Sequence, residues 1–137
     1  MEILGDWDGF YSYESSRMGV DVPFRLSVVE ESELGFAGSI QDDANSGGHP
    51  MAGKITGHKL PGQRIKFVKE MPVGFFRTAG RSVIGGSCYR IHYQGNVGPD
   101  GRVQGEWNTR AGIIWYRWMP ILHVPGRGKW EMWRPRA

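Results

Sequence analysis

Eight short stretches of the chain alternate apolar and polar residues with a period of two, and turn residues separate them. They cover residues 7–14, 22–29, 34–42, 51–58, 64–71, 87–97, 102–108 and 128–134. This period is that of a β-strand with one buried face. Consecutive strands joined by short connections pair antiparallel. The sequence therefore predicts one all-β domain over residues 1–137, folded as an antiparallel meander.

The continuous apolar face of these strands favours a closed structure, since eight strands can form an up-and-down barrel that leaves no exposed edge. The chain contains 21 glycines, and five of them fall on the expected inward face, where they would bend strands and leave room for large neighbours or a ligand: Gly9, Gly38, Gly53, Gly57 and Gly105. We predict an eight-stranded antiparallel up-and-down β-barrel, with a two-sheet β-sandwich as the structural alternative.

Connection lengths fall into two sets along this meander. The segments 30–33, 59–63 and 98–101 are tight turns, whereas 15–21, 43–50, 72–86 and 109–127 are long. Alternate connections of a meander lie at opposite ends, so the long ones should gather at one mouth of the barrel. Long loops on a rigid scaffold often carry function. We therefore expect any binding site at the long-loop mouth.

Charged and polar residues on the expected inward face mark the candidate ligand-binding site. Alternation places Tyr13, Asp42, Lys69, Tyr89 and Trp107 inward near this mouth, with Tyr11 and Tyr93 deeper. A lysine and an aspartate are costly to bury unpaired, so they should meet each other, a tyrosine hydroxyl, water or a ligand. An internal salt bridge and a pocket for a small polar aromatic or anionic ligand are both consistent with this pattern. Acid–base catalysis in a small enzyme is a weaker alternative.

The most apolar segment of the chain, residues 113–124, lies inside the last long connection. It holds Trp115 and Trp118 and is interrupted by Pro120, so it is too short to span a membrane as a helix. It could cover the mouth as a lid or an extra strand, form a homo-oligomer interface through the two tryptophans with Phe75 and Phe76, or contact a membrane surface. A structural or protein-interaction module using this segment is the alternative function.

Charge and composition restrict the other classes. Residues 1–50 carry a net charge of −8 and residues 51–137 carry +11, yet the basic residues are scattered singly, which does not favour a nucleic-acid partner. Cross-strand pairing of acidic and basic strands explains the asymmetry as well. One cysteine, Cys88, and four histidines without ligand spacing indicate no metal site. With neither a signal-like start nor an apolar transmembrane run, a cytoplasmic location is expected.

Gly5-Asp6-Trp7, which opens the first strand, resembles the G-x-W motif of the calycin superfamily, which includes lipocalins, fatty-acid-binding proteins and avidins. The resemblance implies a lipocalin- or streptavidin-like barrel that binds a small ligand. It also implies that an arginine at the end of the last strand packs over Trp7, and Arg134 matches that position, with Arg136 next. The T-D-Y motif of lipocalins and the biotin-binding signature of avidins are absent from the sequence.

The stretch 4–14 is also similar to the start of the nitrobindin family, whose barrels bind haem through a histidine. The resemblance implies a ligand among the four histidines His49, His58, His92 and His123. Strand alternation places His58 and His92 on the outward face, so a haem-binding barrel is a weaker alternative. Neither resemblance identifies the cofactor or ligand of this chain.

Overall fold

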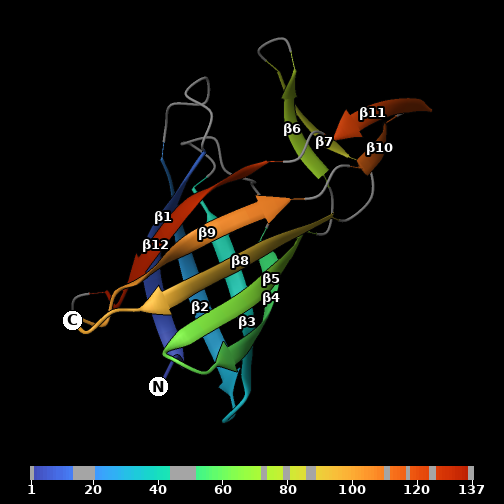
Figure 1. The fold of residues 1–137 in the computed structure, drawn as a ribbon. Coiled ribbons are helices and arrows are strands. Elements are labelled where there is room, and N and C mark those ends of the chain that lie inside the picture. The colour runs from blue at the N-terminus through green and yellow to red at the C-terminus, as the bar shows by residue number, and fades with distance from the viewer. Residues whose placement is uncertain are drawn as a thin grey trace.

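The computed structural model is an all-β structure whose eight longest strands form a closed antiparallel barrel (Figure 1). The structure describes residues 2–13, 21–43, 52–71, 74–78, 81–85, 89–109, 112–116, 118–123 and 126–135. Only the backbone is described for residues 74–78, 81–85, 89, 112–116 and 119–123. The barrel strands are β1 (Gly5–Tyr13), β2 (Val22–Glu31), β3 (Gly35–Asp42), β4 (Gly53–Leu60), β5 (Arg64–Met71), β8 (Tyr89–Val97), β9 (Val103–Thr109) and β12 (Arg127–Trp133).

Each strand of the barrel pairs with its neighbours in the chain, and β12 pairs with β1 to complete the circle. This topology confirms the predicted up-and-down barrel and excludes the β-sandwich. Strand bounds shift by a few residues, most clearly in the fourth strand, which covers Gly53–Leu60 where 51–58 was expected. The long connections follow β1, β3, β5 and β9, so they all leave the barrel at one end, as predicted.

Two hairpins occupy parts of the long connections that the period-two pattern did not assign to strands. β6 (Gly74–Thr78) pairs with β7 (Arg81–Gly85), and β10 (Gly112–Tyr116) pairs with β11 (Met119–His123). Each pair is a separate two-stranded sheet outside the barrel. The segment 113–124 is therefore not an extra strand of the barrel, and both hairpins extend beyond its upper end in Figure 1.

Large side chains fill the middle of the barrel. The rings of Phe67 and Tyr93 stack with centroids 4.6 Å apart, and Trp130 packs edge-on against Phe67 at 5.4 Å. Inward glycines make room for such rings, because a Cβ on Gly57 would overlap the ring of Phe36. At Gly57 and Gly9 the volume that the glycine leaves is taken up by a neighbouring aromatic ring, that of Phe36 or Phe24.

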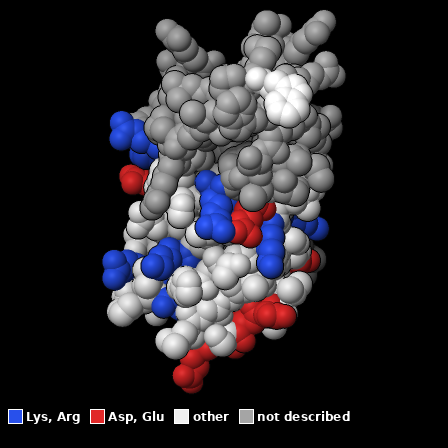
Figure 2. Space-filling view, turned by 90° about the vertical axis from the view of Figure 1, so that its right-hand side faces the viewer, with Lys and Arg blue, Asp and Glu red and all other residues white. Residues whose placement is uncertain are grey.

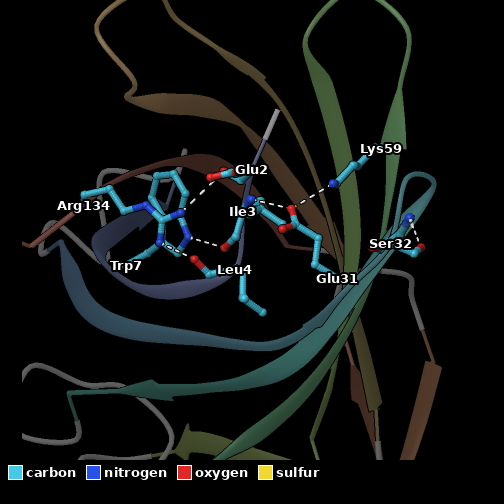
Figure 3. A network of polar contacts seen from close by, with 9 residues as sticks. Glu2, Ile3, Leu4, Trp7, Glu31, Ser32, Lys59 and Arg134 are labelled. Atoms are coloured by element: carbon cyan, nitrogen blue, oxygen red, sulfur yellow. Dashed lines mark hydrogen bonds and ion pairs between the residues drawn. The ribbon is translucent and has the colours of Figure 1, made fainter.

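An arginine and a tryptophan close the tight-turn end (Figure 3). The guanidinium of Arg134 lies 4.1 Å from the centroid of the Trp7 ring and donates a hydrogen bond of 2.7 Å to the carbonyl of Leu4. The Trp7 indole N–H donates to the carbonyl of Ile3 at 2.8 Å. The stacking that the motif implied for Arg134 is therefore present.

The segment before β1 is also held by a carboxylate at this end. Glu31 accepts a hydrogen bond from the backbone N–H of Ile3 and forms an ion pair of 2.8 Å with Lys59 (Figure 3). These contacts lower the pKa of Glu31, with the Lys59 hydrogen bond as the main cause. The contacts join residues before β1 to the ends of β2 and β4.

Ion pairs that join the acidic residues 1–50 to the basic remainder include Glu31 with Lys59 and Asp42 with Lys69. The cross-strand pairs on the outer wall each join residues of the same half, so they do not explain the uneven charge. Asp8 of β1 pairs with Arg25 of β2 at 3.0 Å, and Glu70 of β5 pairs with Arg90 of β8 at 2.9 Å. Such exposed pairs add little stability. Acidic side chains also gather at the lower, tight-turn end in Figure 2. Within the described ranges, no helix is long and apolar enough to cross a bilayer.

Candidate functional site

Three polar side chains from alternate strands meet inside the barrel, toward the long-loop mouth. The ammonium of Lys69 on β5 donates to Oδ2 of Asp42 on β3 at 2.7 Å, and the hydroxyl of Tyr11 on β1 donates to the same oxygen at 3.2 Å. Their exposed fractions are 1% for Lys69, 5% for Asp42 and 7% for Tyr11. We call these three residues the buried polar triad.

A glycine on the intervening strand lets Lys69 reach Asp42. Gly53 of β4 lies between β5 and β3, and a Cβ placed on it would come within 3.1 Å of Lys69 Cγ and 2.8 Å of Met71 Sδ. The aliphatic stem of Lys69 therefore passes over Gly53, where any larger residue would obstruct it. The end position of Asp42 in β3 brings its carboxylate to the same level of the barrel.

Burial and the neighbouring charge of Asp42 set the protonation behaviour of Lys69 and Tyr11. Burial lowers the pKa of Lys69 below its ordinary value of 10.5, and the charge and hydrogen bond of Asp42 oppose this effect. Burial raises the pKa of Tyr11 far above its ordinary value of 10.0, and the negative charge of Asp42 raises it further. Tyr11 therefore remains a protonated hydrogen-bond donor throughout the physiological pH range.

One oxygen of the triad is left without a partner. Among the residues that the structure describes, Oδ1 of Asp42 is buried and has no hydrogen-bond partner, whereas Oδ2 accepts two hydrogen bonds. Native proteins leave few buried polar atoms unpaired, since each costs free energy. The contacts described for Lys69 use one of the three N–H donors of its ammonium. The triad thus presents a free acceptor beside donors that a further group could engage.

Aromatic rings border the triad on the mouth side. Tyr13 and Trp107 pack perpendicular to each other with centroids 5.2 Å apart, and each contacts Tyr11 at about 6 Å. A hollow of about 560 Å³ lies on the outer wall over β1, β12, β9 and β8. Tyr13 and Trp107 line it together with exposed outward residues, Asn108 and Arg127 among them, and it includes none of the triad. A larger groove of about 670 Å³ crosses the outer wall and includes none of the triad.

Of the seven predicted ligand-binding residues, the structure brings five together: the triad, Tyr13 and Trp107. Tyr93 lies deeper, stacked on Phe67 in the core. Tyr89 begins β8, paired with Met71, but its side chain lies outside the described residues. Asn108 and Arg127 were not predicted. They are paired at outward positions of β9 and β12 and line the hollow on the outer wall, not the interior around the triad.

Two of the candidate haem-ligating histidines lie on the outside of the barrel. His58 is exposed, and His92 lies on the outward-facing side of β8, as alternation predicted. Cys88, His49 and Arg136 lie outside the described residues, as does the side chain of His123. Among the residues that the structure describes, no three or more His, Cys, Asp and Glu side chains cluster as metal ligands would.

No family model, curated protein or solved structure matches this chain. The fold and the candidate site together define a closed eight-stranded antiparallel barrel with a buried tyrosine–aspartate–lysine triad beneath one mouth. This arrangement is the basis for a functional assignment, which has to rest on the chemistry of the triad and its aromatic border.

Proposed function

We propose that this barrel binds a small polar aromatic or anionic molecule at its long-loop mouth, with the buried polar triad as the recognition centre. The observation that carries the proposal is the unpaired Oδ1 of Asp42, buried beside a charged lysine. A purely structural salt bridge gains nothing from an unpaired carboxylate oxygen. A ligand hydroxyl or N–H group would supply the missing donor.

The remaining groups suit the same ligand chemistry. The ammonium of Lys69 has donors beyond its bond to Asp42, and these would attract a carboxylate, phenolate or carbonyl oxygen. Tyr13 and Trp107 provide ring edges and faces against which a planar molecule can pack. A site that combines apolar walls with a few fixed polar groups is typical of small-molecule pockets.

Thermal-shift screening and native mass spectrometry test this proposal directly. The probes are small phenols, aromatic carboxylates and aromatic amides, and we expect at least one class to stabilise the protein and to be retained as a stoichiometric complex. Isothermal titration then compares the wild type with the Asp42→Leu/Lys69→Met double variant, which should lose binding. Lys66→Met is the matched control, because Lys66 is exposed on the same strand.

Two results would overturn the proposal. One is a screen in which none of these classes stabilises the wild-type protein. The other is a ligand that binds the double variant as tightly as it binds the wild type, because the triad would then have no part in recognition. Circular dichroism of each variant establishes that a loss of binding does not reflect a loss of the barrel.

A further inference from the structure

The two hairpins outside the barrel share one end of the molecule and one unusual composition. They belong to the connections 72–88 and 110–126, which follow β5 and β9 and so leave the barrel on the mouth side. These two connections hold four arginines and none of the 14 acidic residues of the chain: Arg77, Arg81, Arg110 and Arg117. They are therefore a concentrated positive region of the sequence.

Strand pairing shows that β10–β11 has no polar face. Residues paired across a two-stranded sheet share a face, and successive pairs occupy opposite faces. Ile113 pairs with Leu122 and Trp115 with Pro120 on one face, while on the other face Ile114 pairs with Ile121 and Tyr116 with Met119. Whichever face is turned toward the barrel, the opposite face is apolar.

The hairpin β6–β7 repeats this feature on a smaller scale. Phe75 pairs with Ile84, and the next pair along the ladder, Phe76 with Val83, belongs to the other face. The remaining pairs contribute Arg77 and Arg81. Apolar residues therefore occur on both faces of both hairpins, the ladder of β6–β7 adds two arginines, and neither hairpin contains a carboxylate.

Trp118 is the most exposed large apolar residue of the described chain. It lies between β10 and β11, is 95% exposed and has a φ of 68°, a left-handed conformation that a tryptophan rarely adopts. Tryptophan is enriched at the boundary between water and lipid, where its ring is buried and its N–H stays hydrated. An indole held at a hairpin tip is suited to that boundary.

We propose that the hairpins β6–β7 and β10–β11 dock the protein onto an anionic lipid surface, with Trp118 inserted at the headgroup level and the arginines contacting lipid phosphates. Interfacial binding combines burial of apolar residues with attraction of basic residues to anionic lipids. Charge favours this partner over a second copy, because two copies meeting through this end would bring eight arginines together without a carboxylate from either set of hairpins. The aliphatic content, with Ile113, Ile114, Ile121 and Leu122, fits acyl chains better than it fits nucleobases.

Co-sedimentation with vesicles tests this docking. The wild-type protein is added to vesicles of phosphatidylcholine alone and to vesicles that also contain about 30% phosphatidylserine, a content that gives a negative surface potential. We expect binding to the anionic vesicles, a blue shift of tryptophan fluorescence, and weakening of binding when salt is raised. Trp118→Ser should weaken binding several-fold, and Arg77→Gln/Arg81→Gln should weaken it by about five-fold for each arginine removed.

Matched controls separate the docking surface from general charge and hydrophobicity. Leu34→Ser removes an exposed apolar residue at the tight-turn end, and Arg25→Gln/Arg64→Gln removes the same charge from the barrel wall. Both controls should bind like the wild type. The proposal is overturned by a folded wild type that binds neither vesicle, by equal binding to both vesicles, or by a lipid-independent dimer that Trp118→Ser dissociates.

Discussion

The ammonium of Lys69 lies 2.7 Å from a carboxylate oxygen of Asp42, and both side chains are almost completely buried within the barrel. Bringing two charges out of water costs free energy that their attraction offsets only in part. Such a pair is therefore weak evidence for stability, and a fold can dispense with it. Its presence here, with one carboxylate oxygen unpaired among the described residues, supports the binding role that we propose for the triad.

Replacing the pair tests this point. Lys69→Met should lower the free energy of unfolding by about 3–5 kcal/mol, because Asp42 is left as a buried carboxylate without its cation. The double variant Asp42→Leu/Lys69→Met should be as stable as the wild type or more stable, since apolar residues of similar volume then fill the space. Urea unfolding followed by fluorescence measures both. A double variant no more stable than Lys69→Met would show that the fold requires the pair.

The pH dependence of Asp42→Asn should reveal the buried lysine. Burial lowers the pKa of Lys69 below 10.5, and the variant removes the opposing effect of Asp42. Between the lowered value and 10.5 the unfolded chain binds more protons than the folded protein, so stability rises with pH. We expect the free energy of unfolding to rise more steeply with pH in the variant than in the wild type as the pH approaches the ordinary lysine pKa. Parallel pH profiles would contradict this account.

Tyr11 should act in the opposite direction in alkali. Its pKa in the folded protein is raised far above 10.0, so above that pH the unfolded chain loses a proton that the folded protein keeps. Stability should therefore fall as pH rises above about 10, and Tyr11→Phe should flatten this decline. At neutral pH the variant should cost about 1 kcal/mol for the lost hydrogen bond to Asp42. Urea titrations at a series of pH values give both quantities.

Arg134 should not be replaceable by lysine. Its guanidinium stacks on Trp7 and donates to the carbonyls of Leu4 and Asp6, and a compact ammonium cannot do both. We expect Arg134→Lys to destabilise the protein by about 1–2 kcal/mol. Hydrogen exchange should accelerate for the amides of residues 3–7 and stay unchanged at β5 and β8. Uniform acceleration through the barrel would indicate a global effect instead of loss of this clamp.

The packing of Phe36 over Gly57 gives a test of the filled interior. Gly57→Ala should lower the free energy of unfolding by about 1–3 kcal/mol, because the new methyl group overlaps the phenyl ring. Adding Phe36→Leu removes the overlapping ring, so the double variant should be more stable than the sum of the two single changes predicts. Thermal unfolding of the four proteins completes the cycle, and strict additivity would mean that the two positions do not contact.

Alternation was sufficient to predict the barrel because its period is imposed by the backbone and one face of every strand is buried. The same rule placed Asp42 and Lys69 inward, and the cost of isolated charge predicted that they would meet. It could not predict the hairpins at 74–85 and 112–123, in which apolar pairs occur on both faces and the alternation of apolar and polar residues is lost. Nor could alternation show that the missing side chain of Gly53 leaves space for Lys69 to reach Asp42, since this depends on β3, β4 and β5 lying side by side.

Because β1 and β12 pair to close the barrel, the barrel can be completed only after its last strand is available. Gly9 pairs with Met132, so strands from opposite ends of the sequence must find each other last. Until β12 has left the ribosome, β1 and β9 both present unpaired backbone edges that other chains can join. We therefore expect folding to be slow and cooperative, with the risk of aggregation concentrated in the interval before the final strand is available.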